Sequence, residues 1–112
     1  FDAKDIRKSM PRFEPENYAA NLKLLAPFEQ LAKEAGCSPA QLALAWLLHK
    51  DSNIIPIPGT TSVEHLMDDL ASVDVKLSPE LIQQLDQLIN EKTVVGNRYN
   101  DLANSEVDTE FF

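Results

Sequence analysis

An unbroken apolar run, LALAWLL at residues 42–48, lies near the middle of this 112-residue chain and directly follows a helix-start signal. Ser38 is a typical N-cap residue, Pro39 suits the first helical position, and Gln41 completes a capping box. The pattern therefore predicts a helix over residues 38–49 that is apolar on every side. Such a helix must be covered on most of its surface. Because a chain of this length has few elements to cover it, we expect some of its neighbours to be missing.

Further segments have the apolar spacing of helices. Residues 17–35 form the first, in which Pro27 predicts a kink or a late start and Gly36 ends the helix. Residues 62–72 form the second, with an apolar stripe that we expect to be buried. That stripe consists of Val63, Leu66, Met67 and Leu70. Residues 79–90 form the third, and its inward-facing residues are Leu81, Ile82, Leu85, Leu88 and Ile89.

Residues 53–58, NIIPIP, predict one short strand. Its apolar residues do not alternate with polar ones, as is typical of a strand buried on both faces of a parallel sheet. A single strand cannot satisfy its own backbone hydrogen-bonding groups. The sequence therefore implies a sheet whose other strands lie elsewhere, on missing residues or on another chain. Residues 1–16 predict an irregular segment, and residues 91–112 predict a loosely ordered tail.

The composition argues against several classes of protein. Eighteen Asp and Glu against ten Lys and Arg give a net charge of −8, and without a basic patch such a chain is repelled by nucleic acid. No apolar run approaches the ~18 residues that a membrane span needs. The single Cys37 excludes an internal disulfide framework and indicates a reducing, cytoplasmic compartment. Since the chain opens at Phe1 without an initiator Met, we expect a fragment or a processed chain.

The segment IPIPGTTS, residues 55–62, combines a strand, a glycine turn, hydroxyl side chains and a helix start. Free N–H groups at a helix start suit a phosphate, as do the permissive Gly59 and neighbouring hydroxyls. Those hydroxyls belong to Thr60, Thr61 and Ser62. Ordinary helix capping explains the same residues, because Ser and Thr favour N-caps. Both interpretations stay open on spacing alone.

His65, Asp68 and Asp69 are spaced to share one face of the helix that follows. A metal site is one use of such a face, and a solvated polar surface is the commoner one.

Several motifs together resemble the C-terminal part of the aldo-keto reductases. They are DIR at residues 5–7 with PRF at 11–13 and EN at 16–17, CSPAQLALAWLL at 37–48, IIPIPGT at 54–60, and GNRY at 96–99. The strings QLALAWLL and PIPGT are specific for this family, and the resemblance covers nearly the whole chain.

The resemblance implies a (β/α)₈ TIM barrel with its active site at the carboxyl ends of the strands. This chain would be a C-terminal fragment of that α/β barrel, itself mostly α-helical with one short strand. Residues 53–58 would form the last barrel strand, 62–72 the last barrel helix, 79–90 an extra helix and 91–112 the tail. The lone strand and the all-apolar helix would then have their neighbours in the rest of the barrel.

By resemblance, the turn after the last strand binds the adenosine end of a nicotinamide dinucleotide. The residues at those positions are Gly59, Thr60, Thr61, Ser62, His65, Asp68 and Asp69. The family implies NADP(H) in preference to NAD(H), together with a small carbonyl substrate. Because no Lys or Arg lies between residues 51 and 75, the 2′-phosphate would lack its usual cation, and NAD(H) stays open.

The family's catalytic Asp, Tyr, Lys and His lie on earlier strands. Neither Tyr18 nor Tyr99 has an Asp five residues before it, as the family's Tyr does. We therefore expect part of an NAD(P)H-dependent oxidoreductase that reduces aldehydes or ketones to alcohols, inactive as this chain alone. A non-catalytic helical module that self-associates or binds a protein partner is the alternative.

Overall fold

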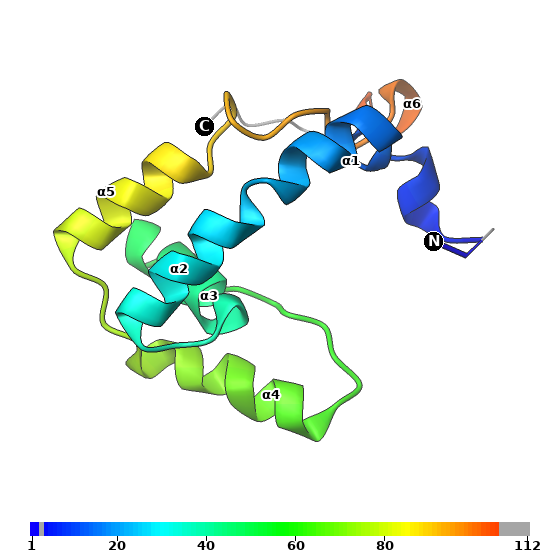
Figure 1. The fold of residues 1–112 in the computed structure, drawn as a ribbon. Coiled ribbons are helices and arrows are strands. Elements are labelled where there is room, and N and C mark those ends of the chain that lie inside the picture. Colours follow the sequence, from blue (N-terminus) through cyan, green and yellow to red (C-terminus); the bar gives the residue numbers. More distant parts are fainter. Residues whose placement is uncertain (3, 106–112) are drawn as a thin grey trace. The chain divides into compact units, whose positions relative to one another are not determined.

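The computed structural model describes residues 1–2 and 4–105, and the chain divides into two compact units (Figure 1). Phe1–Leu24 and Asn90–Phe112 form what we call the terminal unit, and Leu25–Ile89 form the central unit. The helices of the terminal unit are η1 (Ile6–Ser9), η2 (Pro11–Phe13), α1 (Pro15–Leu22) and α6 (Asp101–Asn104). Those of the central unit are α2 (Leu25–Ala35), α3 (Pro39–Lys50), α4 (Val63–Leu70), η3 (Ala71–Asp74) and α5 (Pro79–Leu88).

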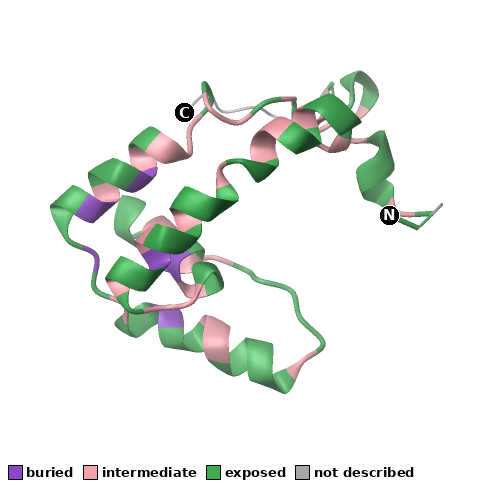
Figure 2. Ribbon diagram, in the orientation of Figure 1, coloured by how far each residue is buried: buried purple, intermediate pink, exposed green. Residues whose placement is uncertain are grey.

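The core of the central unit forms around α3, which contacts α2, α4 and η3, while α2 also contacts α5. Leu42 and Ala45 of α3 are fully buried, while Ala43 is exposed and the rest of the apolar run is half-buried. Leu42 and Ala45 belong to one cluster of buried side chains, which gathers where α2, α3 and α5 pack together (Figure 2). Its other members are Ala32, Leu77, Leu81 and Leu85. The predicted inward face of α5 is confirmed by its buried and half-buried leucines and isoleucines.

Local side-chain chemistry sets where these helices begin. The predicted capping box is present at α3: the Gln41 N–H donates to Ser38 Oγ at 3.1 Å, and the Ser38 N–H donates to Gln41 Oε1 at 3.1 Å. Ser78 caps α5 by accepting the Leu81 N–H. Each bond pairs a donor that the first helical turn would otherwise leave unpaired.

The segment predicted as one helix over residues 17–35 is two helices, α1 and α2, with a break after Leu22. Pro27 lies in the first turn of α2, where a residue needs no N–H because no helical acceptor precedes it. The prediction of a late start is therefore correct for α2. Gly36 ends α2 with φ of +70°, and the following Cys37 N–H reaches back to the Ala32 carbonyl, as in a Schellman motif.

The strand predicted at residues 53–58 is not observed: the described part of the chain contains helices and turns but no strand. Asp51 instead closes a turn, with its carboxylate accepting the Asn53 N–H and its carbonyl accepting the Ile54 N–H. The connection then runs outside the packed helices to α4 (Figure 1). A strand exists only when a second strand pairs its backbone groups, and no described residue provides one.

The prediction of a buried apolar stripe on α4 is also wrong. Val63 is 77%, Met67 62%, Leu70 57% and Leu66 45% exposed. The least exposed residues of α4 are the carboxylates Asp68 and Asp69. The helix therefore packs on α3 through a polar side, and the described residues offer nothing that covers its apolar side.

The terminal unit joins the two ends of the chain. Asn21 binds both groups of Val95: its Nδ2 donates to the Val95 carbonyl at 2.8 Å, and its Oδ1 accepts the Val95 N–H at 2.8 Å. Arg12 Nε donates to the Gly96 carbonyl at 3.0 Å. The loosely ordered tail predicted for residues 91–112 is thus wrong for residues 91–105, which form turns, hydrogen bonds and the short helix α6. Residues 106–112 lie outside the described residues.

The predicted irregular segment at residues 1–16 contains the short helices η1 and η2. The rings of Phe1 and Phe13 form a cluster with Tyr18 of α1, with centroids 5.5 to 5.9 Å apart. Arg7 lies over the Phe1 ring at 4.2 Å, a cation–π geometry.

Gly96 is where the terminal unit should be most sensitive to substitution. Its φ is +86°, and an added Cβ would lie 2.9 Å from Asn17 Nδ2 and 3.0 Å from the Arg12 backbone N. Gly96→Ala should therefore destabilise the terminal unit by about 2–4 kcal/mol, combining backbone strain with overpacking. Urea unfolding followed through the amide resonances of residues 12–21 and 94–97 measures this loss.

Gly36→Ala is the matched control, because Gly36 also has positive φ but a Cβ there would meet nothing within 4 Å. It should cost only about 1 kcal/mol from the backbone alone. Equal losses in the two variants would mean that the close approach at Gly96 is unimportant.

A second prediction concerns Asp86, which joins α3 to α5. Its Oδ1 accepts from Trp46 Nε1 at 2.7 Å and from Lys50 Nζ at 2.6 Å. The Lys50 hydrogen bond, with a smaller contribution from Trp46, lowers the pKa of Asp86 below the ordinary value of an aspartate. A lowered pKa means that the stabilisation is complete above about pH 4 and is lost as pH falls through the folded-state pKa.

Wild type should therefore lose more stability than Asp86→Asn on acidification from about pH 7 to about pH 2.5. Urea unfolding followed by the fluorescence of Trp46, the one tryptophan of the chain, measures the difference. The difference should be small, because both side chains of the ion pair are more than a third exposed. Identical losses in the two proteins would show that Asp86 carries no acid-sensitive stabilisation.

Candidate functional site

The turn before α4 is built by two hydroxyl side chains. Thr60 Oγ1 accepts the Ser62 N–H at 3.1 Å, and Ser62 Oγ accepts the His65 N–H at 3.3 Å as the N-cap of α4. A hydroxyl that accepts a backbone hydrogen still carries its own O–H donor. The turn therefore keeps hydroxyl donors while its backbone is held in place.

The space around this turn is open. A Cβ added to Gly59 would meet nothing within 4 Å, and Thr60, Thr61 and His65 are exposed. The unpaired N–H groups of the first turn of α4 give this end of the helix a partial positive charge. Hydroxyls, backbone donors and an imidazole thus lie together at one accessible place. This arrangement can bind an anion such as a phosphate.

Asp68 lies elsewhere, in the contact between α4 and α3. Ser38 Oγ donates to Asp68 Oδ2 at 2.7 Å, and Gln41 Nε2 donates to the Asp68 carbonyl at 3.1 Å. One of the predicted site residues, Asp68, is thus engaged by the start of α3. Asp69 is half-buried beside it in sequence.

The local electrostatics oppose an anionic ligand. Glu64, Asp68 and Asp69 all lie on α4, and no Lys or Arg occurs between residues 51 and 75. Burial raises the pKa of the Cys37 thiol, and the negative charge of Asp68 raises it further. His65 is therefore the one basic residue of this segment that is available to face a phosphate.

The described residues hold no group of three His, Cys, Asp or Glu that could bind a metal ion. In the same residues, no helix has both the length and the apolar composition needed to cross a membrane.

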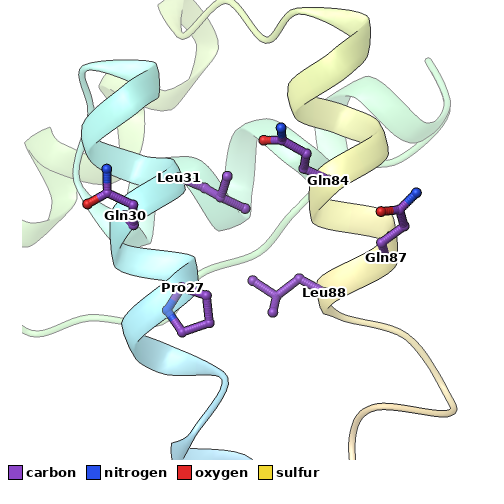
Figure 3. A pocket seen from close by; sticks show the side chains of 6 residues that line it. All are labelled: Pro27, Gln30, Leu31, Gln84, Gln87 and Leu88. Atoms are coloured by element: carbon purple, nitrogen blue, oxygen red, sulfur yellow. The ribbon is translucent and has the colours of Figure 1, made fainter.

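A groove of about 390 Å³ lies between α2 and α5 (Figure 3). Its lining consists of Pro27, Gln30, Leu31, Gln84, Gln87 and Leu88. None of these side chains is titratable or nucleophilic, so the groove offers no chemistry for catalysis. The turn before α4 remains the candidate site.

Sequence reasoning missed the partners of Asp68. The capping box at Ser38 and Gln41 was visible as a local pattern, but the same two side chains also bind a residue about thirty positions away. No periodicity reports such a contact. The only signal was that Asp68 lies on the polar side of an amphipathic helix.

Comparison with known proteins gives the class of this chain. The model described as the aldo/keto reductase family matches residues 2–90. The aldo-keto reductase yakc, NADP(+), of Schizosaccharomyces pombe is 36% identical over 107 residues, which are 96% of this chain and 32% of that protein. The chain belongs to the aldo/keto reductase family.

Membership of this family implies the (β/α)₈ barrel that the resemblance predicted. The chain spans about a third of the length of the curated relative. A largely helical chain is consistent with part of such a barrel.

Proposed function

We propose that this chain is the C-terminal, cofactor-binding part of an oxidoreductase that reduces aldehydes or ketones to alcohols with NADP(H) or NAD(H). The observation that carries the proposal is the open turn at residues 59–62, capped onto α4, in a chain of this family. The relative from S. pombe is named for NADP(+), which favours the phosphorylated cofactor. The free Cys37 fits a cytoplasmic location.

The turn suits the phosphates of such a cofactor better than its extra 2′-phosphate. Gly59 leaves space for close approach, and the hydroxyls of Thr60, Thr61 and Ser62 supply donors. His65 would face the 2′-phosphate, and Asp69 the adenine. When bound, the cofactor supplies the hydride for carbonyl reduction, and these residues hold and orient it.

The place of the turn in the barrel follows from the same proposal. Residues 53–58 would become the last barrel strand once other strands pair with them, 62–72 the last barrel helix, and 79–90 an extra helix outside it. Residues 54–60 support this assignment, because they form no helix and most of them are exposed.

The chain alone should not catalyse the reaction. Carbonyl reduction needs a positioned proton donor as well as a cofactor. Tyr18 and Tyr99 lack the spacing of the family's tyrosine, and the other catalytic groups belong to earlier strands. Carbonyl-dependent oxidation of NADPH by the pure chain, above a heat-denatured control, would contradict this part of the proposal.

Cofactor binding is tested by titrating the chain with adenosine 2′,5′-bisphosphate and with adenosine 5′-monophosphate. Perturbed amide resonances confined to residues 59–66 should show saturable binding of both. His65→Arg should strengthen binding of the bisphosphate by roughly threefold to tenfold relative to the monophosphate, because a permanent cation then faces the 2′-phosphate.

His65→Gln is the matched control, since it keeps a polar side chain without a charge. It should leave the ratio of the two affinities within about twofold of the wild-type ratio or lower it. If neither ligand perturbs residues 59–66, the cofactor role of this turn is wrong.

Self-association is a second candidate function, and the exposed apolar side of α4 favours it. Val63, Met67 and Leu70 are each more than half exposed on one short helix. Sedimentation of the wild type should show a concentration-dependent dimer, and Val63→Ser with Met67→Ser should return it to monomer. A wild type that stays monomeric at about 100 µM would remove this candidate.

A further inference from the structure

The capping box of α3 does more than start that helix. Ser38 Oγ accepts the Gln41 N–H at 3.1 Å and donates to Asp68 Oδ2 at 2.7 Å. Gln41 uses Oε1 for the Ser38 N–H and Nε2 for the Asp68 carbonyl, at 3.1 Å in each case. Two side chains at the start of α3 thus grip both the carboxylate and the backbone of one residue on α4.

Little else in the described residues fixes α4. None of its residues is buried, and its apolar side chains are exposed. The next firm attachment is Ser72 in η3, which is 4% exposed. The grip on Asp68 is therefore the main polar constraint on the angle at which α4 leaves α3.

We propose that Ser38 and Asp68 are positioning residues for cofactor binding, acting through the orientation of α4. This inference rests on the proposed function. Ser62, which caps α4, carries the candidate phosphate turn, so the turn moves with the helix. From Ser62 to Asp68 the helix rises about 9 Å, so a small tilt at Asp68 displaces the turn appreciably. Asp68 then orients the site through its hydrogen bond with Ser38. The turn and His65 make the contacts with the cofactor.

Removing the Asp68 carboxylate distinguishes a positioning role from a purely electrostatic one, because the two roles predict opposite changes in ligand affinity. If Asp68 acts only as a nearby negative charge, Asp68→Ala should strengthen the binding of a phosphorylated ligand. If it positions α4, the same substitution should weaken binding despite the lost charge. Asp68→Asn is the matched variant, because its amide oxygen still accepts from Ser38 while the charge is gone.

The experiment titrates the full chain with NADP+ and with its 6-deamino analogue, in which an oxygen replaces the adenine amino group. Asp68→Ala and Ser38→Ala should weaken both ligands by roughly threefold to tenfold, while Asp68→Asn and Ser38→Thr stay within about twofold of wild type. The double variant Ser38→Ala, Asp68→Ala should be no weaker than the weaker single variant.

Two results would overturn the proposal. One is Asp68→Ala binding NADP+ as tightly as Asp68→Asn. The other is a loss for NADP+ that the deamino analogue does not share, which would make Asp68 a direct contact of the adenine. Unfolding curves from Trp46 fluorescence verify that each variant is folded during the titration.

The proposed function can fail separately, if wild type shows no saturable binding of NADP+. The effect of the Ser38–Asp68 hydrogen bond on α4 is then measured by hydrogen exchange at the His65 amide, which donates to Ser62. Asp68→Ala should speed that exchange relative to Asp68→Asn, and equal rates would refute the positioning role.

Discussion

The packing of one apolar helix organises the central unit. Leu42 and Ala45 of α3 have no solvent exposure. The helices α2, α4 and η3 pack directly against α3. Burial of these side chains removes apolar surface from water, which is the main favourable term for a chain of this size. The hydrogen bonds at the ends of α3 then determine the directions in which the neighbouring helices leave the core. Hydrophobic packing holds the unit together, and hydrogen bonds orient it.

The two kinds of interaction differ in how far a sequence reveals them. The cap of Ser38 on Gln41 spans three residues, so its pattern could be recognised directly and proved correct. The bond from Ser38 to Asp68 spans thirty residues, and it depends on how two helices pack. Helix starts were accessible to local reasoning for this reason. The contact of Asp68 with the start of α3 was not.

Two of the predictions that the structure does not bear out, the strand and the buried stripe of α4, share one cause. Ile55 and Ile57, which are 81% and 92% exposed, have the apolar character of a buried strand. Val63 has the same character on the helix that follows. A residue pattern records the environment for which a segment is suited, but the described residues do not contain that environment. Family membership accounts for the pattern, because barrel strands and helices cover such surfaces.

Asn21 and Val95 have a consequence for how the chain responds to mechanical load. Their paired hydrogen bonds join positions 74 residues apart, so they close the intervening chain into a loop. A pulling force applied at the chain ends would pass through the hydrogen bonds between Asn21 and Val95. It would bypass the helices that lie between these two positions in the chain. The bonds are solvent-exposed and would open before the buried leucines experience tension. The central unit would bear load only after the bonds of Asn21 to Val95 and of Arg12 to Gly96 have opened.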